Sequence, residues 1–126
     1  MSWFAAHILL YVKLKSHPQN RFPLWENIIL IQAESEDEAF TKAEQRGHEE
    51  EGDEDGSFRW GGQPAQWVFA GVRKLTLCQD AEKRPRDGTE VSFTEMEVGS
   101  KEAIGKLLQG EPVSVKLMDK FKTFAS

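Results

Sequence analysis

The sequence is poor in cysteine and has no strong basic cluster. Cys78 is the only cysteine among 126 residues, so no disulfide can form within the chain, and a reducing compartment such as the cytoplasm is the expected location. The one basic run, residues 83–86, is flanked by acidic residues on both sides. Because duplex binding requires clustered positive charge, we expect no nucleic-acid partner.

Long hydrophobic runs are also absent. The most apolar segment, residues 3–12, is far shorter than the roughly 20 residues that a membrane-spanning helix needs. No basic residue precedes it, Lys13 and Lys15 follow it, and no small-residue cleavage site comes after it. This segment therefore predicts a strand rather than a signal peptide, and we expect no membrane association.

Motifs that support catalysis are missing as well. The sequence has no GxSxG, P-loop or GxGxxG pattern, and its three histidines have no metal-binding spacing. Cys78 lies among apolar neighbours, which favours an inert buried thiol. We therefore expect a protein that is not an enzyme, with no catalytic residue, no bound metal and no cofactor.

What the sequence does contain is strong strand periodicity. Even positions of residues 3–15 are apolar throughout, which indicates a strand with one buried face. Its odd positions are half apolar, so we expect the second face to be covered by a helix or by another subunit. Residues 24–34 form the next expected strand, and the unbroken run of residues 28–31 is typical of a central strand buried on both sides.

Two helices have clear start signals. Ser35 and Glu38 form a capping box that predicts a helix over residues 36–46, with Gly47 as its stop. Ser100 caps a second helix over residues 101–109. Further strands are expected at residues 66–79, where Gly71 suggests a bulge, at residues 90–98 and at residues 113–117.

These elements predict one α+β domain over residues 1–126, with the order ββαββαβ. We expect a mostly antiparallel sheet of four to five strands with one or two helices on one face. A ferredoxin-like arrangement is the alternative, since omission of the first strand leaves the split βαβ order. A mobile acidic loop at residues 48–57 and a loose tail at residues 119–126 complete the prediction.

The acidic loop is the most unusual stretch, because six of the seven residues 49–55 are acidic. It matches the first half of a calcium-binding EF-hand loop, but Gly62 occupies the position of the essential bidentate Glu. The formal net charge is −5, so the rest of the chain is close to neutral. The loop is either a solvated segment or a charged segment that binds a basic partner.

Candidate binding residues follow the acidic loop. Arg59 and Trp60 precede a Gly-Gly pair and could stack on a ligand or a partner, while Trp60 could equally fold back over the sheet. Trp67 and His7 complete a hypothetical pocket with them. The alternative for His7 is a packed, hydrogen-bonded side chain.

Three stretches of the sequence together resemble a known family. They are WFAAHILLYVKL, ENIILIQAESEDEAFTKAEQRG, and WVFAGVRKLTL followed by DGTEVSF. In this order they are similar to the bacterial family called domain of unknown function 4288, over about residues 3–98. The resemblance implies a small bacterial α+β domain without an established activity, and residues 99–126 are an addition to it.

The leading functional hypothesis is a non-enzymatic protein-interaction module that forms a homo-oligomer, most simply a homodimer, or binds another protein. One alternative is a toxin-immunity or inhibitor protein that uses its acidic loop against a basic surface. Another alternative is a small-ligand sensor or an enzyme with a pocket near Trp60.

Overall fold

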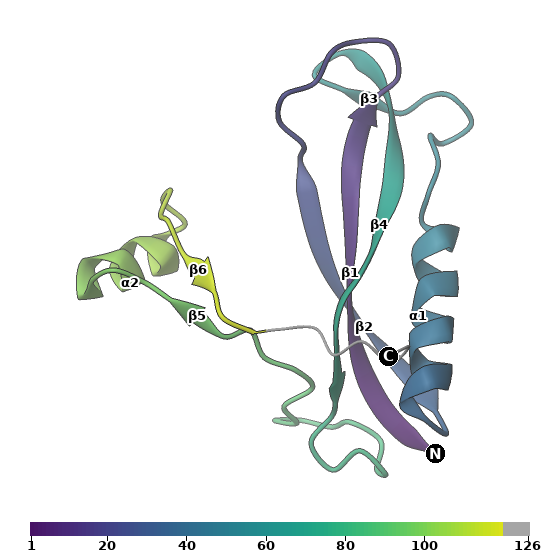
Figure 1. Ribbon diagram of the computed structural model, residues 1–126, viewed down its shortest axis with the longest axis vertical. Helices are drawn as coiled ribbons and strands as arrows, with labels where there is room; N and C mark the ends of the chain where they lie inside the picture. Colours follow the sequence, from purple (N-terminus) through teal and green to yellow (C-terminus); the bar gives the residue numbers. More distant parts are fainter. Residues whose placement is uncertain (120–126) are drawn as a thin grey trace.

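The computed structural model describes residues 1–119 and shows an α+β protein built on a four-stranded antiparallel sheet (Figure 1). The strand order is β2-β1-β4-β3. The strands span Ser2–Leu14 (β1), Leu24–Ala33 (β2), Arg59–Trp60 (β3) and Gln63–Leu77 (β4). The predicted fold class is confirmed. The ferredoxin-like alternative is wrong, because all strand pairs in the described residues are antiparallel and that fold needs a parallel pair.

β1 is the central strand, and its even positions form the core. Helix α1 (Glu36–Glu49) covers this face of the sheet (Figure 1). Phe4 and Ala6 pack with Ala39 and Ala43 of the helix. The two alanines lack bulk, so the helix axis can lie close to the strands.

The prediction that Gly47 ends α1 is wrong, because the helix continues to Glu49. Gly47 is buried instead, and a Cβ atom at this position would overlap the ring of Phe69. The missing side chain makes room for that ring against the helix. This glycine therefore serves packing rather than helix termination.

β2 is an edge strand, which corrects the prediction that residues 28–31 lie in a central strand. It pairs with β1 on one side, and no other strand within residues 1–119 pairs with it. Ile28 is 51% exposed and Leu30 is 45% exposed. Part of the apolar surface of β2 is thus buried and part remains exposed.

β4 is bulged at two places where it pairs with β1. The register shifts between His7 and Ile8 and again between Leu9 and Leu10. The second shift adjoins Gly71, whose φ of 150° disfavours a side chain, so the predicted bulge is confirmed.

The expected strand at residues 90–98 is largely wrong. Only β5 (Met96–Glu97) is a strand, and it pairs with β6 (Lys116–Leu117) rather than with the main sheet. Residues 90–95 leave the strand conformation because Ser92 and Phe93 bond to side chains on the face of the sheet opposite α1. Helix α2 (Lys101–Gln109) lies between β5 and β6, as its capping residue predicted.

Residues 96–117, which we call the arm, project away from the main sheet (Figure 1). Helix α2 has no buried residue. Neither described helix is long and apolar enough to cross a membrane. The tail predicted at residues 119–126 lies outside the described residues except for Asp119, which is bonded to Lys74.

Candidate functional site

The acidic segment after α1 is attached to the sheet at three points. Glu51 accepts a hydrogen bond of 3.0 Å from the backbone N–H of Phe69, and Gly52 and Trp67 exchange two backbone hydrogen bonds. Asp53 forms an ion pair with Lys15. The hydrogen bond from His48 and that from Phe69 lower the pKa of Glu51, and the bond from Lys15 lowers the pKa of Asp53. Both carboxylates are therefore ionised at neutral pH.

These attachments create a groove at the C-terminal end of α1. Its cavity has a volume of about 530 Å³. Trp25 and Trp67 contribute aromatic surface, and Leu10 contributes aliphatic surface. The remaining lining residues are Gly52 and five polar residues: Asn27, Glu49, Glu50, Glu51 and Glu54. The groove thus combines four carboxylates with two indole rings, and no basic side chain of residues 1–119 lines it.

The tryptophans are held in place by one another. The rings of Trp25 and Trp67 lie 4.8 Å apart and those of Trp25 and Trp60 lie 5.6 Å apart, both edge to face. Phe58 stacks on Trp67 at 5.4 Å. Trp60 remains 40% exposed at the end of this aromatic cluster. These ring contacts position Trp25 and Trp67 on the aromatic side of the groove.

The structure brings together only part of the predicted site. Trp60 and Trp67 meet through Trp25, and Arg59 is exposed beside them with its guanidinium donating to the carbonyl of Gly56 at 3.1 Å. His7 lies on the opposite face of the sheet. The predicted pocket of four residues is therefore not formed.

Sequence reasoning missed Trp25, although a signal for it existed. The pairing of β1 with β2 places Trp25 opposite Leu10, and the pairing of β1 with β4 places Trp67 opposite Val12. Leu10 and Val12 both belong to the even, helix-covered positions of β1. A hairpin register assigned from the first two strands would have placed Trp25 on this face.

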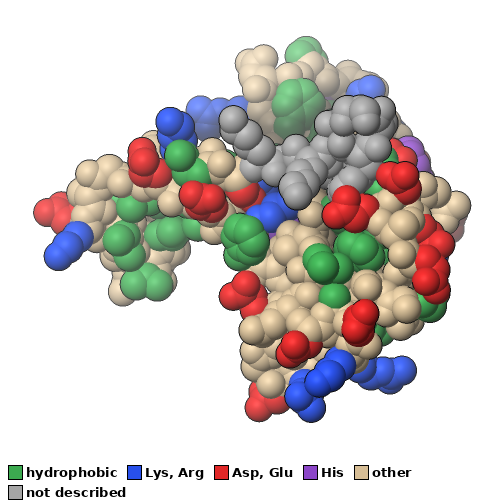
Figure 2. Space-filling model, turned by 60° about the horizontal axis from the view of Figure 1, so that its bottom comes forward, with side chains coloured by type: hydrophobic (Ala, Val, Ile, Leu, Met, Phe, Trp, Pro, Cys, Tyr) green, Lys and Arg blue, Asp and Glu red, His purple; other side chains and the backbone are tan. Residues whose placement is uncertain are grey.

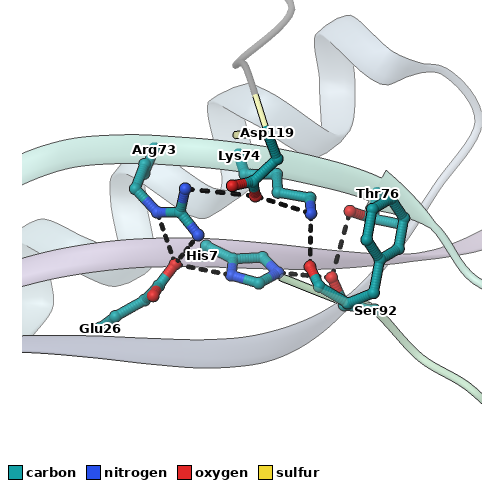
Figure 3. A network of polar contacts seen from close by, with 8 residues as sticks. His7, Glu26, Arg73, Lys74, Thr76, Ser92 and Asp119 are labelled. Atoms are coloured by element: carbon teal, nitrogen blue, oxygen red, sulfur yellow. Dashed lines mark hydrogen bonds and ion pairs between the residues drawn. The ribbon is translucent and has the colours of Figure 1, made fainter. Parts of the chain in front are cut away.

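His7 is the centre of a separate network on the face of the sheet opposite α1 (Figure 3). The side chain is fully buried. Its Nδ1 lies 2.8 Å from the Glu26 carboxylate, and its Nε2 lies 2.5 Å from the hydroxyl of Ser92. Ser92 also bonds to the hydroxyl of Thr76 at 3.1 Å. The interpretation of His7 as a packed, hydrogen-bonded side chain is confirmed.

A bulge in β4 adds two cations to this network. Neighbouring residues of a regular strand point to opposite faces, but the extra residue at Arg73 lets both Arg73 and Lys74 bond to Asp119. Arg73 also pairs with Glu26 at 2.5 Å. The hydrogen bond from Lys74 lowers the pKa of Asp119 to about 2. Burial raises the pKa of Glu26, but the bonds from His7 and Arg73 outweigh burial and lower it.

The order of Glu26, His7 and Ser92 matches the acid, imidazole and hydroxyl of a serine hydrolase. The ring of His7 is fully buried, whereas the Ser92 side chain is half-buried and its hydroxyl also donates to the hydroxyl of Thr76. Lys74 donates to the carbonyl of Phe93 and lies 3.6 Å from that ring. The contacts describe a clasp that fastens residues 92 and 93 onto β1 and β4.

The clasp covers part of the second face of β1, the face of its odd positions. Ala5 and His7 are buried there without a second subunit. For His7 the covering residue is Ser92 of the same chain, so neither a helix nor a second subunit is needed to cover this side chain.

Comparison with known proteins identifies one family. No curated protein and no solved structure matches the chain. The family model described as "Domain of unknown function (DUF4288)" matches residues 3–92. The match includes the main sheet, α1 and the clasp as far as Ser92, and it ends before the arm. The chain therefore belongs to the DUF4288 family.

Proposed function

We propose that this chain is a non-enzymatic protein-interaction module that binds basic side chains of a partner protein in the groove at the end of α1. The observation that carries the proposal is the lining of that groove, in which four carboxylates surround two indole rings without a basic residue from the described part of the chain. Lys and Arg are the side chains that such a lining recognises, through charge and through cation–π contact.

The electrostatics of the fold strengthen this preference. Glu49 and Glu50 lie at the C-terminal end of α1, where the helix dipole adds partial negative charge. Within residues 1–119, no basic side chain forms an ion pair with Glu49, Glu50 or Glu54. These three carboxylates therefore remain available to an incoming cation.

A toxin-immunity or inhibitor protein is one case of this function, because such proteins oppose an acidic surface to a basic one and gain association rate from it. The cytoplasm remains the proposed location, since Cys78 is a free thiol and the single cysteine allows no disulfide within the chain.

The test uses a short Arg- and Lys-rich peptide as the probe and the intrinsic tryptophan fluorescence as the readout. We expect the full chain to bind this peptide at low salt and to lose affinity as salt increases. The triple variant Glu49→Gln, Glu50→Gln, Glu54→Gln should weaken binding at least tenfold.

A matched control removes the same charge elsewhere. The variant Glu82→Gln, Glu90→Gln, Glu111→Gln neutralises three exposed carboxylates outside the groove. Equal loss of affinity in both triple variants would show that only net charge attracts the peptide, and the groove would then be abandoned as the site.

A further inference from the structure

The edge strand β2 has a surface that the other residues of 1–119 leave exposed. Leu24, Ile28 and Leu30 alternate along the strand, so they project from the face opposite α1. Each of these three side chains is between 45% and 58% exposed. We call them the β2 patch.

The backbone edge beside this patch pairs with no other strand within residues 1–119, although Lys42 bonds to one of its carbonyls. Lys42 donates to the carbonyl of Gln32, so that carbonyl points away from β1. Because backbone groups alternate in direction along an antiparallel strand, those of Ile28 and Leu30 point to the same outer edge. Natural edge strands are usually protected by charged side chains or proline. The sole charge in β2 is Glu26, and its carboxylate is turned to His7 and Arg73.

The arm carries a second open surface. Ile104, Leu107 and Leu108 follow helical spacing, so they share one side of α2, and Leu108 is 81% exposed. Apolar side chains gather on the arm in Figure 2. Isolated helices shorter than about 12–15 residues are marginal in water, and α2 spans nine residues with none buried. The arm therefore requires packing from outside itself.

Charge selects the occupant. Residues 96–117 contain three Glu and three Lys, so the arm is neutral, and the one charged residue of β2 is already paired. The whole chain has a formal charge of −5. Charge repulsion between two copies of an acidic protein is weakest where neutral surfaces meet, whereas a basic partner is drawn to the acidic groove. The neutral arm and the neutral β2 patch thus suit a second copy of this chain.

We propose that two copies form a reciprocal dimer in which α2 of each copy packs on the β2 patch of the other. The contact is closed and symmetric, because each copy supplies one arm and receives one. It covers the two apolar surfaces that the single chain leaves exposed. It does not depend on the function proposed for the groove.

Light scattering of the full chain over a range of concentrations measures the state of association. We expect twice the 14.3 kDa mass of one chain at high concentration. Leu108→Glu in the arm and Ile28→Glu in the β2 patch should each weaken the dimer at least tenfold, because each would bury a carboxylate in an apolar contact. Leu77→Glu is the matched control: Leu77 is 57% exposed in β4, outside both surfaces, and its variant should dimerise like the original chain.

Mixing the two variants tests the reciprocal arrangement. In a dimer of the Leu108→Glu and Ile28→Glu chains, one contact has both changes and the other has none, so the mixture should form dimers more strongly than either variant alone. Circular dichroism checks that each variant is folded.

Three results would overturn the proposal. They are a monomer at every concentration, a dimer that neither substitution weakens, and a mixture that dimerises no better than its components. The last result would indicate arm-to-arm or edge-to-edge contact instead. If the chain is a folded monomer and a different protein covers its arm, the occupant is that protein and not a second copy.

Discussion

At the scale of single residues, Gly47 and Asp119 show how neighbours change what a side chain does. Gly47 lies within a helix, where alanine is normally preferred. Asp119 lies beyond the arm, yet it neutralises two cations on β4. Neither role follows from the residue type or its local sequence.

Gly47→Ala should destabilise the protein, against the usual preference of helices. The added methyl group would overlap the buried ring of Phe69, so we expect a cost near the upper end of the roughly 1–3 kcal/mol typical of overpacking, which outweighs a gain in helix propensity of about 1 kcal/mol. Urea unfolding followed by tryptophan fluorescence measures the change. Gly105→Ala in α2 is the control, since its added methyl group would meet no atom of residues 1–119 within 4 Å, and it should not lower the free energy of unfolding.

The clasp should make the protein sensitive to acid. The pKa of Asp119 is about 2 in the folded chain, below the value of about 3.9 expected when the chain is unfolded. The unfolded chain therefore binds more protons, so the contribution of Asp119 is complete above pH 4 and is lost as the pH falls through about 2. Urea midpoints at several pH values test this. Asp119→Asn should lower stability at neutral pH and flatten the profile between pH 4 and 2, whereas Asp87→Asn at an exposed turn should keep the original slope.

At the scale of elements, the two helices begin alike but belong to different environments. The Ser35 hydroxyl accepts from Glu38 N–H at 3.1 Å, and the Ser100 hydroxyl accepts from Ala103 N–H at 3.2 Å. Helix α1 packs on the sheet, whereas α2 has no buried residue.

Removal of each cap should consequently have different effects. Ser35→Ala should lower the free energy of global unfolding by about 1 kcal/mol, because it leaves an amide at the start of a packed helix without its partner. Ser100→Ala should leave the global urea midpoint of the main sheet unchanged at low protein concentration and reduce helicity in the arm. A common shift of the midpoint in both variants would contradict the separation of arm and sheet.

The elements that sequence predicted well are those specified locally. The alternation in β1 and the caps at Ser35 and Ser100 depend on residues within one strand or one turn. The edge position of β2 and the path of residues 90–95 depend on distant partners. β1 pairs with β4 on its second side, which leaves β2 at the edge, and Ser92 bonds to His7 from 85 residues away. The two bulges of β4 also change the register, so sequence could not show that Trp67 and His7 lie on opposite faces.

At the scale of the whole molecule, the chain consists of a cohesive sheet with one helix and an arm with little support of its own. β1 is paired on both sides, and its contacts with β2 and β4 join the start of the family-matched region to residues as far along as Leu77. The arm contributes two strands of two residues each and one exposed helix. Local opening should therefore be far easier in the arm.

Hydrogen exchange should separate these two parts. Amides of β1 and β4 should be the most protected, and those of α2 should exchange fast in dilute solution. If α2 packs on a second copy, its protection should increase with protein concentration while that of β1 stays constant. Uniform protection of arm and sheet in dilute solution would contradict this division.

The clasp also has a consequence for synthesis. The ribosome makes His7 at the start of the chain and Ser92 85 residues later. At about 5–20 residues per second, the imidazole therefore lacks its second partner for several seconds. During that interval β1 and β2 can form a hairpin, but one edge of β1 stays unpaired until β4 leaves the exit tunnel. A nascent chain that stalls before β4 would present this apolar edge to other chains, so chaperones should be needed at that point in translation rather than at its end.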